Sequence, residues 1–342
     1  METICWTVED KEQLHDHSYI KQAAARLKQG ETIAFPTETV YGLGADATSS
    51  EAVKKVFEAK GRPADNPLIV HVGSRDVIEQ YVRYISDKAN QLIEAFWPGS
   101  LTIILPLKGG FSDNVTAGLT TVGVRMPDHP VAIALLQEAG IPVAAPSANS
   151  SGKPSPTSHT HVLQDLNGKI NGVVNGGQTG VGVESTVIDC TLETPVILRP
   201  GGVTKADIEA VIGPVDVAPA LVETFDSPRS PGMKYKHYAP DCPVWVVQGD
   251  TKSMCKVLTE LRDDGYSVGL MVSDELASEL GEQTELKLGS CEDLNQITSE
   301  LYSTLRKIDE LDYDIVLAES FIKEGIGEAL MNRLEKAASK II

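Results

Sequence analysis

Apolar residues follow the spacing of an amphipathic helix in residues 50–60. Val53 and Val56 lie three residues apart, so that they share one helical face. Ser50 is a suitable N-cap and Gly61 a suitable stop. The flanking sequence predicts a strand at 32–35, a polar loop punctuated by glycines at 36–44, and a second strand at 68–72.

Helix-like and strand-like runs continue to about residue 212. The predicted helices are 18–29, a short one starting at Ser74, one capped by Ser86, 129–140 and 205–211. The predicted strands are 100–105, 121–127, 142–145, 172–174, 185–189 and 196–198. The order predicts one α/β domain, which ends at Gly213-Pro214.

The segment 146–157, PSANSSGKPSPT, has two interpretations. Its composition is typical of a flexible Ser/Pro linker. Its position favours a site loop, because it directly follows a strand that looks buried and lies in the middle of the domain. Hydroxyls, Asn149 and backbone amides at a strand end are suited to hold phosphate or the edge of an adenine.

Residues 213–241 are the predicted linker, since they are rich in proline and lack periodicity. Their centre, SPGMKYKHYAP, is cationic and aromatic, so the segment is either a tether or a lid that closes over the first domain. Beyond it, strand and helix patterns alternate to the end of the chain, which predicts a small parallel α/β domain. This domain contains no G-x-G-x-x-G, so no cofactor site is predicted there.

Composition agrees with a folded chain of two domains. Of 342 residues, 42% are hydrophobic and 23% charged, which is ordinary for a globular protein. The first residues do not have the pattern of a secretion signal, and no apolar run is long enough to span a membrane, so we expect a cytoplasmic protein. The five cysteines are scattered and include no C-x-x-C, which argues against a disulfide framework and a zinc site.

The net charge of −18 lies mainly in the C-terminal part. Residues 241–342 hold 21 acidic against 10 basic side chains, a balance of −11, which leaves −7 for the first 240 residues. Binding of nucleic acid through a broad surface requires clustered cations, so this balance argues against it. A local basic patch is still compatible with the sequence.

Several motifs occur in an order that resembles the threonylcarbamoyl-adenylate synthase family, over the whole length of the chain. They are FPTETVYGLGADA, the K-x-R-x-x-x-N-P pattern from Lys60 to Pro67, TVGVRMP, APSAN with SGKPSPT, ESTVID and ILRPG. SPGMKYKHYAP with a following α/β domain is similar to the longer, two-domain form of the family.

The resemblance implies the fold. Residues 1–212 would form a YrdC-like catalytic domain, a twisted mixed sheet with helices around a cationic concave cavity. Residues 213–241 would be the linker or lid, and residues 242–342 a smaller Rossmann-like parallel α/β domain.

It also implies a nucleotidyltransferase reaction. L-threonine, bicarbonate and ATP would give L-threonylcarbamoyl-adenylate and pyrophosphate, with Mg²⁺ on the phosphates. A downstream tRNA threonylcarbamoyl-transferase complex would use the product to modify adenosine 37 of ANN-decoding tRNAs. The chain itself would not bind nucleic acid stably or contact a membrane.

The family pattern assigns roles to individual positions. The catalytic cations would be Lys60 and Arg62. The contacts to ATP would be Arg62, Asn66, Thr121, Ser147, Ser155, Arg199 and His237. The contacts to L-threonine would be Thr39, His71, Arg125, Ala145 through its backbone, and Ser185. No metal ligand can be identified.

Some of these assignments have a plainer alternative. Lys60 and Arg62 follow a helix C-terminus, where cations commonly complement the helix dipole. His71 lies in an apolar strand, as satisfied core histidines do. Arg125 is costly to bury unless it meets an anion, so an amino-acid carboxylate is a reasonable partner from the residues alone.

Two other functions fit parts of the sequence. A Ser/His hydrolase lacks the G-x-S-x-G elbow and an orienting carboxylate. An RNA-binding module that uses the basic cavity for tRNA or rRNA is the alternative from another class. The net charge and the scarcity of aromatic residues near the cations argue against that module.

Overall fold

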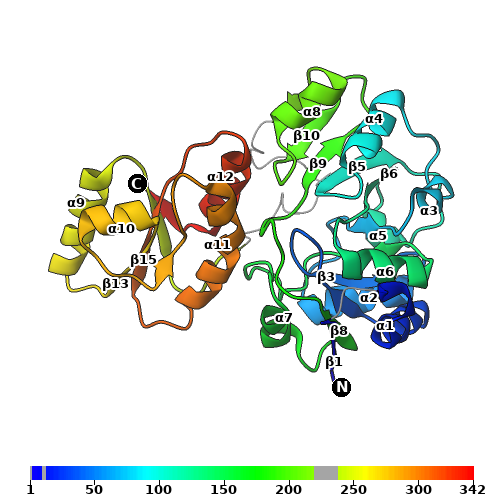
Figure 1. The fold of residues 1–342 in the computed structure, drawn as a ribbon, viewed down its shortest axis with the longest axis horizontal. Coiled ribbons are helices and arrows are strands. Elements are labelled where there is room, and N and C mark those ends of the chain that lie inside the picture. Colours follow the sequence, from blue (N-terminus) through cyan, green and yellow to red (C-terminus); the bar gives the residue numbers. More distant parts are fainter. Residues whose placement is uncertain (1, 10–12, 219–237) are drawn as a thin grey trace. The chain divides into compact units, whose positions relative to one another are not determined.

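The computed structural model describes residues 2–9, 13–218 and 238–342, which form two compact units (Figure 1). The described residues of the first unit are 2–9, 13–151, 156–180 and 184–218. Those of the second unit are 152–155, 181–183 and 238–342. Two short segments from the middle of the chain therefore belong to the second unit.

The first unit is built on an eleven-stranded mixed sheet. Across the sheet the strands are β1 (Ile4–Thr7), β8 (Gly172–Asn175), β2 (Ile33–Phe35), β3 (Gly42–Asp46), β7 (Val143–Ala144), β4 (Ile69–His71), β6 (Thr121–Arg125), β5 (Leu101–Pro106), β9 (Thr186–Asp189), β10 (Val196–Arg199) and β11 (Asp216–Val217). Neighbours such as β4 and β6 are parallel, whereas β2 and β3 are antiparallel. The predicted mixed sheet is confirmed.

Strand β3 (Gly42–Asp46) corrects the sequence interpretation, which extended a loop over residues 36–44. The segment pairs with β2 on one side and β7 on the other, in the interior of the sheet. Glycine is required here because the neighbours approach closely: a Cβ on Gly44 would lie 2.7 Å from Val143 Cγ1 and 2.8 Å from Phe35 Cε1. Glycines that look like loop punctuation thus permit close packing inside the sheet.

The helices predicted for the first unit lie near their expected positions, whereas the helices at Asp113–Thr116 and His159–Leu166 and the 3₁₀ helix were not predicted. They are α1 (Ser18–Lys28), α2 (Ser50–Lys60), α3 (Arg75–Glu79), α4 (Asp87–Phe96), α5 (Asp113–Thr116), α6 (Pro130–Ala139), α7 (His159–Leu166) and α8 (Lys205–Ile212), with a 3₁₀ helix at Leu14–Asp16. The N-cap of α2 is Ser49 and not Ser50, since the Ser49 side chain accepts a hydrogen bond from Ala52 N. Gly61 ends the helix in the left-handed conformation, as predicted.

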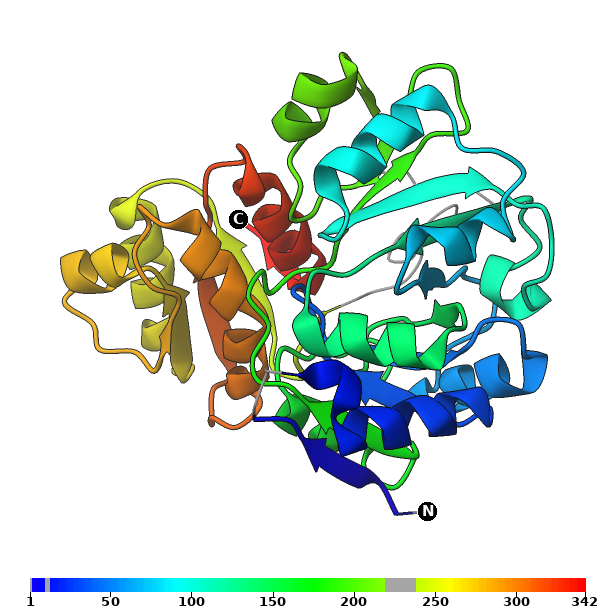
Figure 2. The same cartoon turned by 45° about the vertical axis from the view of Figure 1, so that its right-hand side comes forward.

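Helices cover the sheet in separate groups. α1 and α6 pack side by side, and their apolar faces share a core with β2 and β7 (Figures 1 and 2). α4 and α8 contact each other and contribute to a second core with one face of β4, β5, β6, β9 and β10. The opposite face of these strands carries a small apolar cluster that includes Ile69, Ile104 and Val187, beside the polar side chains described below.

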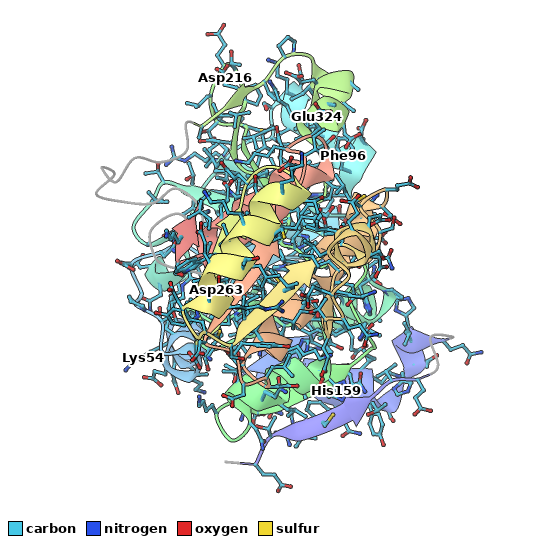
Figure 3. All side chains as sticks on the ribbon, turned by 90° about the vertical axis from the view of Figure 1, so that its left-hand side faces the viewer. Lys54, Phe96, His159, Asp216, Asp263 and Glu324 are labelled. Carbon is cyan, nitrogen blue, oxygen red and sulfur yellow. The ribbon has the colours of Figure 1, made fainter. Side chains whose placement is uncertain are left out.

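The second unit contains a five-stranded sheet in which every pair of neighbours is parallel. Its order is β14 (Leu286–Lys287), β13 (Val268–Val272), β15 (Ile315–Glu319), β12 (Val244–Val247) and β16 (Lys340–Ile341). Its helices are α9 (Thr251–Asp263), α10 (Asp274–Leu280), α11 (Leu294–Ile308) and α12 (Ile326–Ala337). α9 and α10 lie on one face of the sheet, and α11 and α12 on the other (Figure 1); Figure 3 looks onto α9, which ends at the labelled Asp263. The predicted parallel α/β domain is confirmed.

Ion pairs and a hydrogen bond join segment 152–155 to the C-terminal part of the second unit. Lys153 Nζ lies 2.6 Å from Asp241 Oδ2 and 3.2 Å from Asp309 Oδ2. Arg306 donates to the Pro154 carbonyl at 2.5 Å. The predicted domain ranges stay a prediction, because the units are not continuous stretches and most of the predicted linker lies outside the described residues.

Two predicted absences can be compared with the structure. Within the described ranges there is no helix with both the length and the apolarity that a membrane crossing requires. All five cysteines are described, and all are free thiols.

Candidate active site

Four predicted site residues come from one face of neighbouring strands in the first unit. Side chains alternate between the two faces of a strand, and Val70, Val124 and Ile188 point into the core shared with α4 and α8. The alternate positions therefore lie on the opposite face. They are His71 on β4, Thr121 and Arg125 on β6, and Ser185 immediately before β9.

Register places His71 beside Arg125, because these two residues pair directly between the parallel strands β4 and β6. Arg125 is only 3% exposed. Its Nη1 donates to Thr39 Oγ1 at 2.9 Å and its Nε to the Gly99 carbonyl at 3.1 Å. Its Nη2 forms an ion pair with the carboxylate of Glu38. Three residues predicted to bind threonine, Thr39, His71 and Arg125, thus gather at one place.

Thr37 and Thr39 are held by the turn that they form. Thr37 Oγ1 donates to the Val40 carbonyl at 2.6 Å and accepts from the backbone N–H groups of Thr39 and Val40. Its hydroxyl also lies 2.8 Å from Thr39 Oγ1. These bonds show that Thr37 supports the loop, and this support orients the Thr39 hydroxyl toward Arg125.

His71 is a neutral imidazole inside the unit. It is 4% exposed, and its Nδ1 is buried without a hydrogen-bond partner in the described structure. Burial, followed by the positive charge of Arg125, lowers the pKa of His71 to about 3. A neutral ring can accept a hydrogen bond at Nδ1 without adding a second positive charge beside Arg125.

This environment predicts a pH effect on stability. The pKa of His71 is lower in the folded chain than in the unfolded chain, so its contribution is complete above about pH 6.5 and is lost as the pH falls toward 3. Between pH 7 and pH 5.5 the free energy of unfolding of the wild type should therefore fall by on the order of 1 kcal/mol more than that of His71→Gln. Urea titrations at the two pH values measure this difference. His15→Gln, at an exposed position, is the control and should behave like the wild type. An equal fall in the free energy of unfolding for all three proteins would contradict the low pKa of His71.

Arg199 and Ser185 extend the site toward β10. The register of β10 shifts between Ile197 and Arg199, which redirects the Arg199 side chain. Its guanidinium donates to the Ser185 carbonyl from Nε at 3.1 Å and from Nη2 at 2.9 Å. Ser185 Oγ lies 2.7 Å from Thr102 Oγ1 on β5. One predicted ATP contact and one predicted threonine contact therefore touch each other.

Lys60, at the C-terminus of α2, reaches across to the loop after β7. Its ammonium donates to the carbonyls of Ser147 and Asn149, both at 2.5 Å, and lies 3.4 Å from Asn149 Oδ1. Ser147 Oγ donates to the same side-chain oxygen at 2.5 Å. Tyr41 N and Leu43 N donate to the carbonyls of two loop prolines, Pro156 and Pro146. These bonds make the segment an ordered loop and show that the flexible-linker interpretation was wrong.

Arg62 and Asn66 lie in the connection between α2 and β4. Arg62 is half-buried, and its Nη2 lies 3.5 Å from the Asn66 carbonyl. The Asn66 side chain is fully buried, and neither its nitrogen nor its oxygen has a hydrogen-bond partner in the described structure. A buried amide without partners is costly unless a ligand supplies them, so Asn66 indicates a binding position.

Of the remaining predicted residues, some lie in the first unit and others do not. Thr121 is half-buried at the start of β6. Ala145 donates its N–H to the Ile69 carbonyl at 2.9 Å, so a contact to substrate would have to use its own carbonyl oxygen. Ser155 is buried but belongs to the second unit, and His237 lies outside the described residues.

Sequence reasoning did not single out Glu38 as a site residue. It was visible only as one polar residue of the loop. The signal that points to it is an acidic side chain beside Thr39, combined with the isolated arginine at the end of a buried strand, because a buried guanidinium requires a counter-charge.

The chain matches two domain families along its length. Residues 25–201 match the Sua5_yciO_yrdC family, which is described as "Telomere recombination". Residues 203–339 match "Threonylcarbamoyl-AMP synthase, C-terminal domain".

Relatives and solved structures agree with these matches. The chain is 49% identical over 340 residues to a threonylcarbamoyl-AMP synthase of Bacillus subtilis, covering 99% of this chain and 98% of the relative. A crystal structure of Pyrococcus abyssi Sua5 complexed with L-threonine is similar with a TM-score of 0.90 and 41% identity, covering 100% of this chain and 99% of the other. Escherichia coli YciO, 24% identical with a TM-score of 0.52 over 59% of this chain and 96% of its own, shares the fold of the first unit.

Proposed function

This chain belongs to the threonylcarbamoyl-AMP synthase family, and from that premise we propose that it makes L-threonylcarbamoyl-adenylate and pyrophosphate from L-threonine, bicarbonate and ATP. It is an enzyme of the nucleotidyltransferase type, because its product contains the AMP part of ATP. The single observation that carries the proposal for this site is the gathering of Arg125, Thr39 and the neutral His71 on one sheet face.

Threonine occupies the Arg125 end of this face. Arg125 binds the substrate carboxylate, since a guanidinium has five N–H donors and the bonds described above use one on each of its three nitrogens. Thr39 and Ser185 contribute hydroxyls, Ala145 its carbonyl, and His71 an unpaired nitrogen. The similar Pyrococcus abyssi structure, which is complexed with L-threonine, supports this choice of amino acid.

ATP is held by the cations and amides around the same face. Arg62 and Asn66 approach from the end of α2, Arg199 from β10, Thr121 from β6, and Ser147 from the loop after β7. The carbamate of threonine displaces pyrophosphate from the α-phosphorus of ATP. The negatively charged carbamate must therefore approach the negatively charged triphosphate. Arg62 and Lys60 are the catalytic cations that lower this repulsion, by charge and by fixing the loop.

Mg²⁺ fits this site only when it is bound to the phosphates of the nucleotide. In the parts of the chain that the structure describes, no three His, Cys, Asp or Glu side chains are grouped to hold a metal ion. Magnesium commonly binds through phosphate oxygens and water with one or two carboxylates, so no protein cage is required. When bound, it would supply further neutralisation of phosphate charge.

The linker completes the proposal. Ser155 and His237 are assigned to ATP by the family pattern, and residues 213–241 act as a lid that keeps water from the adenylate. Pro228, Pro231, Gly232 and His237 lie outside the described residues, so the lid rests on the sequence alone.

The product is consumed by a tRNA threonylcarbamoyl-transferase complex that modifies adenosine 37 of ANN-decoding tRNAs. The protein acts in the cytoplasm and delivers the adenylate without binding tRNA stably itself. This last point separates the proposal from the RNA-binding alternative.

Omitting one substrate at a time tests the function. Pyrophosphate should be released from ATP only when threonine and bicarbonate are both present, because the carbamate is the nucleophile. Equal release without threonine would contradict the proposal. Binding of tRNA in a gel-shift assay, without any ATP-dependent product, would instead favour the RNA-binding module.

A further inference from the structure

Glu38 faces the same guanidinium that is assigned to the substrate carboxylate. The side chain of Glu38 is 15% exposed and that of Arg125 4% exposed, so their ion pair is largely shielded from water. A second carboxylate oxygen of Glu38 accepts the Asp128 N–H at 3.1 Å, and its backbone carbonyl accepts the Gly180 N–H at 3.0 Å. The Asp128 N–H therefore holds the carboxylate, and the Gly180 N–H holds the main chain that carries it.

The Glu38 carboxylate has capacity for a further donor. A carboxylate offers about four acceptor positions, and the contacts to Arg125 and Asp128 use two. The guanidinium likewise keeps one N–H on each Nη. The pair thus presents an acceptor and a donor next to each other, one negative and one positive.

A free amino acid at neutral pH carries the matching pair of charges on one carbon atom. We propose that Glu38 is a specificity-determining residue that binds the ammonium of L-threonine while Arg125 binds its carboxylate. This inference rests on the proposed function, since it assigns a second contact to the same substrate. Glu38 recognises the zwitterion and so discriminates against acids that lack an amine.

The contact belongs to substrate binding and not to the later transfer. Once the nitrogen has become a carbamate it has lost its positive charge, and the attraction to Glu38 ends. Glu38→Gln should therefore raise KM for threonine by about tenfold to a hundredfold, the loss expected for a hydrogen bond to a charged group, and change kcat less.

Calorimetric titration with two ligands isolates the ammonium contact. One ligand is L-threonine, and the other is 2,3-dihydroxybutanoate, in which a hydroxyl replaces the ammonium. Glu38→Gln should lower the affinity for threonine about tenfold to a hundredfold, and should change the affinity for the hydroxy acid less than about threefold. Glu38→Asp, which keeps the charge, should recover part of the threonine affinity. Glu31→Gln removes the carboxylate of a surface pair with Arg26, 2.7 Å apart, and serves as the matched control.

A second measurement needs only threonine. As the pH rises through the pKa of the substrate's amine, wild-type affinity should fall because the ammonium is lost, and this fall should be absent in Glu38→Gln. Thermal unfolding of each variant checks that it is folded.

Three outcomes would overturn the inference. Equal losses for both ligands would make Glu38 only a support for Arg125. Tighter threonine binding by Glu38→Gln would make Glu38 a competitor of the substrate carboxylate. The same fall with pH in the wild type and in Glu38→Gln would separate Glu38 from the ammonium. Absence of threonine binding to the wild type would instead refute the proposed function.

Discussion

Arg125→Ala should weaken L-threonine binding by roughly 30-fold to 1,000-fold and leave ATP binding almost unchanged. An arginine contact to a bound anion is worth about 2 to 4 kcal/mol, which corresponds to this range. Arg62→Ala should show the reverse selectivity, because Arg62 is assigned to the nucleotide. Calorimetric titration of each variant with each ligand measures the two losses separately.

Arg125→Ala has a second effect that must be separated from the first. It leaves the Glu38 carboxylate without its cation, and removing one partner of a buried pair costs about 3–5 kcal/mol of stability. Thermal unfolding establishes whether the variant is folded at the temperature of the titration. The double variant Glu38→Ala/Arg125→Ala removes both charges and avoids the uncompensated carboxylate.

The double variant decides the cause of the loss. This test uses 2,3-dihydroxybutanoate, which has no ammonium for Glu38 to bind. If Arg125 binds the substrate carboxylate, affinity for this hydroxy acid should stay low when Glu38 is also removed. Recovery of that affinity in the double variant would mean that the uncompensated Glu38 caused the loss, and the assignment of Arg125 would be wrong. The assignment of Arg125 would also be wrong if Arg125→Ala weakened the binding of ATP and left the binding of threonine unchanged.

Elements with a strong local pattern could be predicted from the sequence. Helix α2 has its apolar spacing, a serine cap and Gly61, and it lies within one residue of its expected start. The parallel sheet of the second unit followed from the alternation of strands and helices. Both have a pattern along the sequence that indicates them, although the sheet itself pairs strands that are far apart in the chain, such as Val244 with Val316.

Strand β3 could not be predicted because tertiary packing overrides its local pattern. Gly42 and Gly44 have low strand propensity, yet the space between Phe35 and Val143 admits no larger residue at position 44. That space is created by strands far apart in the sequence. Nothing in residues 42–46 alone indicates it.

The site shows the same division. The family pattern pointed to Thr39, His71 and Arg125, and the register of β4 and β6 brings the last two together. Glu38 was missed, because its importance depends on the contact with Arg125, 87 residues later in the chain. The bonds from Lys60 to the loop after β7 were equally invisible, since they join α2 to a segment nearly ninety residues away.

Lys60→Met tests whether this residue acts through that loop. The substitution keeps an unbranched apolar side chain but removes the ammonium from two carbonyls and from the Asn149 side chain. Hydrogen bonds to a charged group contribute about 1.5–3 kcal/mol, and buried acceptors without a partner add a further cost. We expect the free energy of unfolding to fall by about 2–5 kcal/mol.

Catalysis should fall together with the order of the loop. Ser147 is assigned to ATP and is held by the Lys60 ammonium, so kcat/KM for ATP should decrease while hydrogen exchange in residues 147–151 accelerates. Lys55→Met is the matched control, because Lys55 lies on the same helix and its exposed side chain donates to the Gly30 carbonyl. A large loss of activity with unchanged stability and exchange would show that Lys60 acts directly on the phosphates. Unchanged activity would show that Lys60 is not a catalytic residue and that it only supports the loop.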